Sequence, residues 1–417
     1  MYFLNVVVNH VVYLRKRFKM MRKSRVYLML VFTLVFLIGS SNLLFASDAR
    51  GVSGNQVIIG LIADQTGPAA QLMMPYAAGA RAYFRHINDT GGVNDRKIKL
   101  LVEDDRYSIP MAVAAFKKLV FKDKVLAILG CGGTGQNTAL FSQIEKNKVP
   151  VISLSWSWTM TDPVQRYVFT ATNDNKDEIK VMMEYIVKIM KAKDARIALV
   201  GPDVEYAKSG YRVLEEKAKE YNVVLVGREI LAMDALDATT QVLTLKKQNV
   251  THVITITIDG PTLALLKSAK RLNYWPIFFD SIHAIGNRVI EAGGETAKNL
   301  YATSPIASWF NDTVGISELK KIALKYDPKM APAESYFIKA WITSKIAHEA
   351  IKRAGKNLTP DSFVDTLETI KNLDMKGLTG PVSYSPTNHK GNSYSRMGKA
   401  DLKKGYFVPV TDWIEAK

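Results

Sequence analysis

The amino-acid sequence predicts an α/β protein built from two successive modules, each with a parallel β-sheet. Apolar, β-branched runs of strand length alternate with amphipathic helical segments about every 25–30 residues, which is the pattern of β-α-β units. The alternation begins again after residues 172–175. With 417 residues, 47% hydrophobic and 23% charged, the chain has the composition of a globular protein of two or three domains.

The elements of the first module alternate strictly. The run 56–62 (QVIIGLI) has the length of a strand, and turn residues 64–68 follow it, so a strand ends there. The further strands are expected at 97–102, 125–129 and 150–154, with helices at 77–87, 110–122 and 136–146.

The second module repeats the alternation and is followed by a helical region. From residue 301 the pattern becomes irregular, and the Gly-, Pro- and Tyr-rich tail 380–413 indicates strands and loops. Strands are expected at 196–200, 223–229, 251–258 and 277–279, and helices at 176–192, 208–221, 239–248, 262–272, 314–326, 335–353 and 360–370.

The first 46 residues are predicted to be an N-terminal extension followed by a secretory signal peptide. Arg22, Lys23 and Arg25 precede the apolar run 26–39, and Ala46 offers a cleavage site. The run is shorter than the ~20 residues that span a bilayer; an uncleaved anchor is the alternative. Because no Cys lies near the cleavage point, a lipoprotein is not expected. We expect a periplasmic protein.

The composition argues against a metal site, an internal disulfide and nucleic-acid binding. The single Cys131 and six scattered His form no metal-ligand motif. The net charge of +17 is concentrated in part before the first acid, Asp48, and is otherwise spread along the chain. A nucleic-acid-binding protein more often gathers its charge in a stripe or a known motif. No metal, cofactor or nucleic acid is therefore expected.

The segment Gly130–Gly135 (GCGGTG) matches the dinucleotide fingerprint G-x-G-x-x-G between a predicted strand and a predicted helix. NAD binding also needs an acid about 20 residues on, and none occurs before Asp162. We therefore expect no NAD and no enzyme activity. The glycine-rich turn could instead present backbone N–H groups and the Thr134 hydroxyl to a carboxylate; a tight turn without a ligand is the alternative.

Three segments of the first module contain motifs that are defined by the type and spacing of their residues. They are Gly60-x6-Gly67-Pro68-Ala-Ala-Gln71, Ile87-Asn88-x2-Gly91-Gly92-Val93-Asn94-x-Arg96-Lys97-Ile98-x-Leu100-x2-Glu103-Asp104-Asp105, and Ala112-Val113-Ala114-x-Phe116-x-Lys118-Leu119-Val120. With 128–130, 149–153, 172–174 and 380–382, they resemble the leucine/isoleucine/valine-binding protein family. These are type I periplasmic solute-binding proteins of ABC importers.

The resemblance implies two Rossmann-like lobes joined by a three-segment hinge near 172–175, 301–304 and 380–385. Lobe 1 would comprise 55–172 and 302–381, and lobe 2 would comprise 176–300 and 386–417.

The resemblance also implies a ligand site at the ends of the predicted strands. Residues aligned with Gly133, Thr134, Ser155 and Ser157 would hold the ligand carboxylate. In the second lobe, Tyr206 would contact the ligand and Asp280 would pair with an α-ammonium group; a solvated loop acid is the alternative for Asp280. Each follows a predicted strand, where open α/β sheets bind ligands.

The sequence departs from the family in ways that bear on the ligand. Trp156 and Trp158 flank Ser157, and Leu72 and Met73 stand where relatives have an aromatic. These side chains favour an apolar or aromatic ligand, although either Trp alone could be a packing residue. Asp280 is shorter than the glutamate common in amino-acid binders, so a ligand without an amino group stays open.

Together, these observations predict a monomeric binding protein that is not an enzyme. The expected ligand is a small carboxylate, a branched-chain, apolar or aromatic amino acid, delivered by closure of the lobes to an ABC permease. Transport of a non-amino carboxylate and ligand sensing at a membrane receptor are the alternatives.

Overall fold

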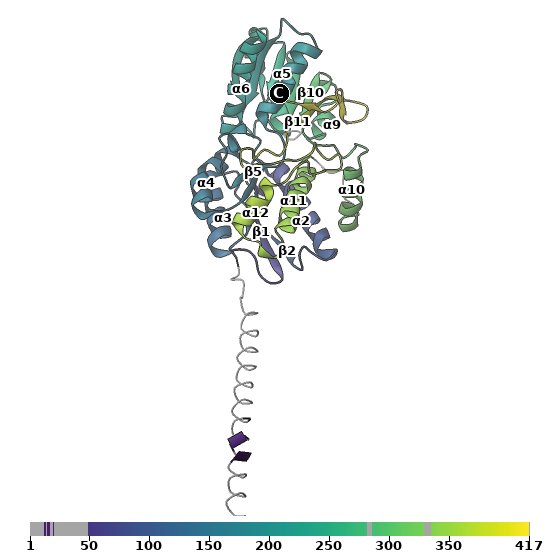
Figure 1. The fold of residues 1–417 in the computed structure, drawn as a ribbon. Helices are drawn as coiled ribbons and strands as arrows, with labels where there is room; N and C mark the ends of the chain where they lie inside the picture. Colours follow the sequence, from purple (N-terminus) through teal and green to yellow (C-terminus); the bar gives the residue numbers. More distant parts are fainter. Residues whose placement is uncertain are drawn as a thin grey trace, which may run out of the picture. The chain divides into compact units, whose positions relative to one another are not determined.

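The computed structural model describes residues 12, 13, 15, 16, 20, 49–281, 286–328 and 335–416. The chain divides into two compact units, residues 1–48 and 49–417, and the fold below is that of the second unit (Figure 1). The predicted signal peptide, residues 21–47, lies outside the described residues. Among the residues that are described, no helix has the length and apolar character of a membrane span.

The first sheet is parallel throughout, as predicted. Its strand order is β2-β1-β3-β4-β5, so the chain moves outward in both directions from β1. Its last strand, β5, was missed by the sequence analysis. The strands are β1 (Gln56–Ile62), β2 (Lys97–Glu103), β3 (Ala127–Gly130), β4 (Val151–Ser153) and β5 (Val168–Thr170).

Helices cover the first sheet and, with it, form lobe 1. The first of them, α2, begins at Ala70 instead of the predicted 77 and contains Pro75, which removes one backbone hydrogen bond but not the helix. The helices are α2 (Ala70–Asp89), α3 (Ile109–Lys117) with the π-helical turn η1 (Lys118–Lys122), α4 (Thr134–Asn147), η2 (Trp158–Met160), α10 (Val314–Tyr326), α11 (Ser335–Ala354), η5 (Gly355–Asn357) and α12 (Pro360–Glu368).

The second sheet is mixed. Its strand order is β12-β11-β10-β9-β8-β6-β7, with β13 paired to β11. Strands β6 to β10 are parallel, and β11 runs antiparallel to β10 and β12. The strands are β6 (Arg196–Gly201), β7 (Val224–Ile230), β8 (His252–Thr255), β9 (Ile277–Ser281), β10 (Leu300–Ser304), β11 (Tyr394–Asp401), β12 (Tyr406–Pro409) and β13 (Ile414–Glu415).

Lobe 2 consists of this second sheet and the helices on its two faces. One apolar core includes Val253, Leu265 and Phe278, and the other includes Ile197, Ile254 and Phe279. Alternate residues of each strand thus face opposite cores, as parallel strands buried on both sides require. The helices are α5 (Asn175–Glu184) with η3 (Tyr185–Ile189), α6 (Glu205–Tyr221), α7 (Thr239–Lys247), α8 (Asp259–Arg271), α9 (Arg288–Gly293) and η4 (Gly294–Ala297).

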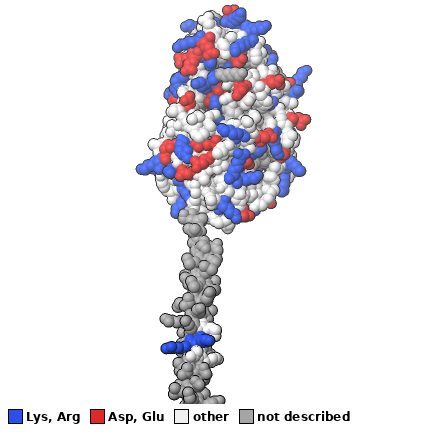
Figure 2. All heavy atoms as spheres, in the orientation of Figure 1, with Lys and Arg blue, Asp and Glu red and all other residues white. Residues whose placement is uncertain are grey.

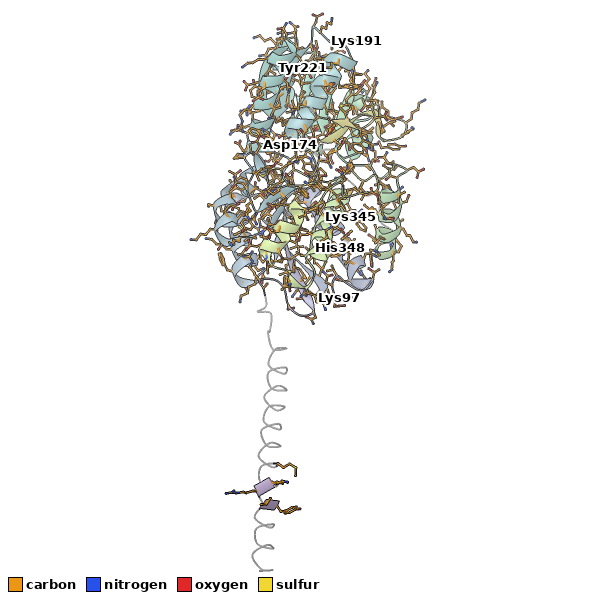
Figure 3. The ribbon with its side chains drawn as sticks, in the orientation of Figure 1. Lys97, Asp174, Lys191, Tyr221, Lys345 and His348 are labelled. Atoms are coloured by element: carbon orange, nitrogen blue, oxygen red, sulfur yellow. The ribbon has the colours of Figure 1, made fainter. Side chains whose placement is uncertain are left out.

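The chain passes between the two sheets after β5, after β10 and before β11. The first and third connections are joined by backbone hydrogen bonds: Thr170 N donates to His389 O (3.0 Å) and Gly391 N donates to Thr170 O (3.0 Å). Asp174, at the start of α5, lies where the two lobes meet (Figure 3). Of the predicted hinge segments, 301–304 belongs to β10, and hinge movement stays a prediction.

Candidate functional site

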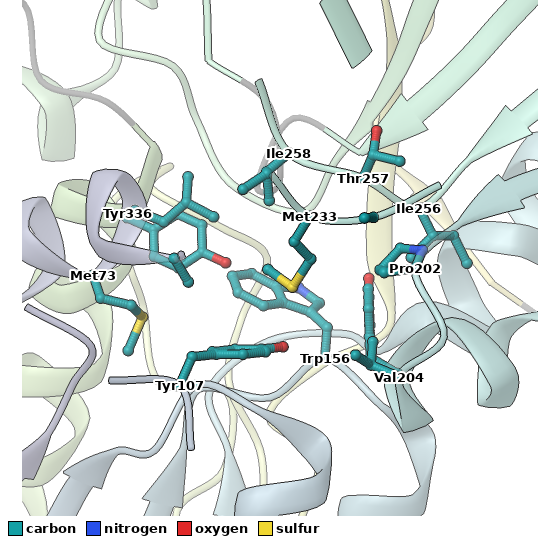
Figure 4. A pocket seen from close by; sticks show the side chains of 15 residues that line it. Met73, Tyr107, Trp156, Pro202, Val204, Met233, Ile256, Thr257, Ile258 and Tyr336 are labelled. Atoms are coloured by element: carbon teal, nitrogen blue, oxygen red, sulfur yellow. The ribbon is translucent and has the colours of Figure 1, made fainter. Parts of the chain in front are cut away.

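A cavity lies between the two lobes (Figure 4). It contains about 680 Å³ of empty space, part of it open to solvent. Its walls follow β1 to β4 in lobe 1 and β6 to β8 in lobe 2, at the carboxyl ends of the strands, where open α/β sheets bind ligands. The lining residues are Ala69, Leu72, Met73, Tyr107, Gly132, Trp156, Pro202, Val204, Tyr206, Ala232, Met233, Ile256, Thr257, Ile258 and Tyr336.

The wall is aromatic and apolar. Trp156 packs at a tilt against Tyr336, with 5.7 Å between ring centroids. Figure 4 shows both rings directed into the same space as Tyr107 and the thioether of Met233. None of the described lining residues has a charged side chain. Such a wall stabilises a ligand mainly by excluding water from apolar and aromatic surface.

The backbone places Tyr107 in the cavity by an uncommon conformation. Arg106 and Tyr107 both have left-handed backbones, with φ of 49° and 54°, and such strain is concentrated at functional sites. The carboxylate of Asp105 accepts a hydrogen bond from Tyr107 N at 3.2 Å and holds this turn. Burial raises the pKa of Tyr107 to about 12, so its phenol stays protonated at neutral pH.

Three of the residues predicted from the sequence line the cavity. Leu72 lies in the first turn of α2, Trp156 follows β4, and Tyr206 lies in the first turn of α6. The structure therefore brings one side chain from lobe 2 and two from lobe 1 to the same space.

Gly133, Thr134 and Ser155 lie behind the wall. Gly133 is the N-cap residue of α4, directly after the wall residue Gly132. The Thr134 and Ser155 hydroxyls are buried and hydrogen-bonded to each other at 2.8 Å. The N-terminus of α4 has backbone N–H groups and a partial positive charge. The carboxylate role predicted for these residues stays a prediction.

Ser157 contributes to a polar network between the lobes. Its Oγ donates to Ser209 Oγ in α6 at 3.0 Å and also bonds Thr159 Oγ1 at 2.8 Å. Asn175 completes this network, because its Nδ2 donates to Ser209 Oγ at 2.8 Å. Ser157 does not line the cavity, and its hydroxyl is committed to neighbouring protein groups.

Asp280 is fully buried and lines a second, smaller cavity. Its Oδ2 accepts hydrogen bonds from Thr262 (3.0 Å) and from Thr255, and its Oδ1 accepts one from Ser281 N (2.7 Å). Burial raises the pKa of Asp280 to about 8. The structure therefore places Asp280 away from the main cavity; its pairing with a ligand ammonium stays a prediction.

Glu178 of α5 shares this smaller cavity with Asp280. Ser281 Oγ donates to Glu178 Oε1 at 2.8 Å, and burial raises the pKa of Glu178 to about 8. Tyr206 and Ile256 line both cavities, so these two side chains separate the acids from the larger space.

The sequence analysis missed a buried lysine behind the wall. Lys339 of α11 is 2% exposed, contacts the face of the Trp156 ring and donates to Leu154 O at 3.4 Å. Burial holds the pKa of Lys339 well below its usual value, and the charge of Glu178 opposes this shift. The available signal was its spacing: Lys339 follows Tyr336 by three residues, so both lie on one face of α11.

Tyr107, Tyr336 and Met233 were also missed. Tyr336 comes from the start of a helix far along the chain, and Met233 from the loop after β7. The acidic stretch before Tyr107 was the only nearby sequence feature that could have indicated a site residue there.

In the described parts of the chain no group of three or more His, Cys, Asp or Glu could hold a metal ion. Basic and acidic side chains are interspersed on the face shown in Figure 2.

Comparison with known proteins identifies the family. Residues 56–405 match the family model described as periplasmic binding protein. The chain is 23% identical over 375 residues to a Leu/Ile/Val-binding protein of Citrobacter freundii, covering 89% of this chain and 93% of that protein.

Two solved structures share the fold. A branched-chain amino acid ABC transporter protein from Thermus thermophilus with bound valine has a TM-score of 0.81 at 24% identity, covering 86% of this chain and 96% of that one. A fatty acid ABC transporter substrate-binding protein from Thermomonospora curvata has a TM-score of 0.81 at 20% identity, covering 89% and 95%. The protein belongs to the periplasmic binding protein family.

Proposed function

We propose that this protein captures a small carboxylate with an apolar or aromatic side group in the cavity between its lobes and delivers it to an ABC permease. The observation that carries the proposal is the wall, in which apolar and aromatic side chains of both lobes face one space at the carboxyl ends of both sheets. The proteins similar in fold support a carboxylate, because they are named for a bound valine and for fatty acids.

The mechanism that we propose is closure about a hinge formed by residues 172–175, 301–304 and 380–385. Lobe 1 contributes Trp156 and Tyr107 to the wall and lobe 2 contributes Tyr206 and Met233. A ligand that contacts both sides binds the closed form more tightly than the open form, and so shifts the equilibrium toward closure. The permease then recognises the closed form. In this mechanism the N-terminal segment is a signal peptide, and the protein acts in the periplasm as a monomer.

The carboxylate would be held behind Gly132, by the N-terminus of α4 and the hydroxyls of Thr134 and Ser155. The proposal is supported by the position of Thr134 at the start of α4, two residues after the wall residue Gly132, and by its hydrogen bond to Ser155. A helix N-terminus favours an anion. Thr134 and Ser155 are uncharged, so these residues would not neutralise the charge of the carboxylate.

Isothermal titration calorimetry tests the proposal. The protein is purified from the periplasmic fraction and freed of ligand by unfolding and refolding, then titrated with leucine, phenylalanine and their deaminated acids. We expect at least one carboxylate to bind at micromolar concentration or below, with a decrease in the radius of gyration measured by small-angle X-ray scattering. Absence of binding by every carboxylate, or binding without compaction, contradicts capture by closure.

A further inference from the structure

We propose that Ser209 of α6 is a positioning residue for the ligand site, which holds the two lobes in their closed arrangement although it does not line the cavity. This inference rests on the proposed function and goes beyond it, because it names what fixes the two sides of the wall. It is carried by a hydrogen-bond network in which Ser157 of lobe 1 and Asn175 and Ser209 of lobe 2 are all buried.

The network joins the backbones of two wall residues that come from different lobes. Asn175 N donates to Trp156 O at 2.6 Å, and Asn175 Oδ1 accepts from Trp158 N at 3.0 Å. Asn175 Nδ2 (3.3 Å) and Ser209 Oγ (2.8 Å) both donate to Tyr206 O. Trp156 and Tyr206 line the cavity, so Asn175 and Ser209 fix these two wall residues relative to each other.

The hydrogen-bonding capacity of the Ser209 hydroxyl is fully used. Its proton is donated to Tyr206 O, and its oxygen accepts from Asn175 Nδ2 at 2.8 Å and from Ser157 Oγ at 3.0 Å. A serine hydroxyl has one donor and two acceptor positions. Because Ser157 donates its own proton to Ser209, the 2.8 Å hydrogen bond between Ser157 and Thr159 must have Thr159 as its donor.

The network continues toward the residues that are proposed to hold the carboxylate. Ser157 N donates to Ser155 Oγ at 3.3 Å, and the Ser155 hydroxyl shares a hydrogen bond of 2.8 Å with Thr134 Oγ1. A shift of the Ser157 backbone therefore changes the position of the Ser155 hydroxyl as well as that of the neighbouring Trp156.

This network favours the closed form over the open form. When the lobes separate, water replaces the partners that the Ser157 and Ser209 hydroxyls lose. In the closed form of Ser209→Ala, by contrast, Ser157 Oγ stays buried without its partner in lobe 2, and a buried polar group that loses its partner is costly. The equilibrium then shifts toward the open form, and the apparent affinity falls with the fraction of protein that is competent to bind.

Calorimetry on the full processed protein tests the inference. The probes are L-leucine, L-phenylalanine, 4-methylpentanoate and 3-phenylpropanoate. We expect Ser209→Ala to weaken binding about tenfold, by the same factor for every probe that binds. The matched control is Ser268→Ala, because Ser268 is also buried in a helix of lobe 2, but its partners Ala238 N and Arg271 belong to the same lobe. The control should bind within about twofold of the wild type.

A second variant and a second measurement separate positioning from general destabilisation. Ser157→Ala removes the other end of the same hydrogen bond and should give a similar loss, whereas in the double variant it should add less than about twofold to the loss caused by Ser209→Ala. In the ligand-free protein, hydrogen–deuterium exchange of peptides covering 156–159 and 175–178 should be at least about threefold faster in Ser209→Ala than in the wild type, and unchanged in Ser268→Ala.

Failure of this inference can be distinguished from failure of the proposed function. Equal losses of affinity in Ser209→Ala and Ser268→Ala, or additive losses in the double variant, overturn the inference but keep capture of a carboxylate. A loss that differs between probes also overturns it, because a residue that acts on closure affects all ligands alike. Silence of the wild type with all four probes overturns both.

Discussion

Lys390 is predicted to hold the third connection against lobe 2, and its replacement by methionine tests this role. Its Nζ lies 2.6 Å from Asp177 Oδ2 and 3.3 Å from Asp174 Oδ2, and these carboxyl side chains are 3% and 6% exposed. Removal of one partner from a buried ion pair costs about 3–5 kcal/mol, because the remaining charge is left without compensation. The Lys390 side chain is 20% exposed, so we expect a loss near the lower limit, about 3 kcal/mol.

The loss should depend on pH. Burial and the charge of Asp174 raise the pKa of Asp177 to about 6, and Lys390 opposes this shift. An acid whose pKa is raised on folding stabilises the fold below its unfolded pKa and loses that contribution as pH rises through the folded pKa. Without Lys390 the pKa of Asp177 rises further. The difference between Lys390→Met and the wild type should therefore be larger at pH 8 than at pH 5.

The assay is urea unfolding followed by circular dichroism at both pH values. Lys403→Met is the matched control, because Lys403 is exposed in a turn between β11 and β12, and we expect it to change stability by less than about 0.5 kcal/mol. In the double variant with Asp177→Asn, at least half of the lost stability should return. The reasoning is refuted if Lys390→Met loses under 1 kcal/mol at pH 8, or loses the same amount at both pH values.

Three further predictions concern the buried acids, the hinge and the wall. Because burial raises the pKa of Glu178 to about 8, the free energy of unfolding of the wild type should fall as pH rises from 5 to 9. Glu178→Gln should make this free energy depend less on pH, and an unchanged pH dependence would contradict the prediction. Gly391→Ala should destabilise the fold by more than about 2 kcal/mol in urea unfolding, because its Cβ would lie 2.2 Å from Ala171 O. Gly260→Ala is the control, because its Cβ would meet nothing within 4 Å. Trp156→Ala should weaken ligand binding about tenfold, as measured by calorimetry. Trp275→Ala, before β9, is the control, and an equal loss of affinity in both variants would refute the role of Trp156 in the cavity wall.

The sequence predicted the elements whose signal is local and repeated. Strand β1 was predicted with its observed limits, because an apolar run closed by turn residues defines both ends. Strand β10 was missed, since LYATS is not apolar throughout; it becomes a strand through pairing with β9 and β11. The start of α2 was misplaced because Pro75 usually ends a helix.

The sequence could predict only those residues of the site that follow the end of a predicted strand. Trp156 and Tyr206 line the cavity because each follows a parallel strand, a relation that needs no knowledge of neighbouring side chains. The surroundings of Asp280 depend on Thr255 and Thr262, and those of Ser157 on Ser209. Such partners come from other elements, so the sequence could nominate these polar groups but could not tell which are already satisfied.

Two glycines of the segment Gly130–Gly135, Gly130 and Gly132, have reasons within the protein for lacking a side chain. A Cβ at Gly130 would lie 2.6 Å from Ile62 O, and one at Gly132 would lie 2.9 Å from the terminal methyl of Met73. In a dinucleotide site the second glycine of the fingerprint, equivalent to Gly132, lets the backbone approach the pyrophosphate; here the space beside Gly132 is taken by the Met73 side chain of the cavity wall. Because Met73 is flexible, a methyl group at position 132 would displace it into the cavity. The size of the ligand site therefore depends on glycine at position 132. In dinucleotide-binding proteins the same G-x-G-x-x-G pattern serves the pyrophosphate instead.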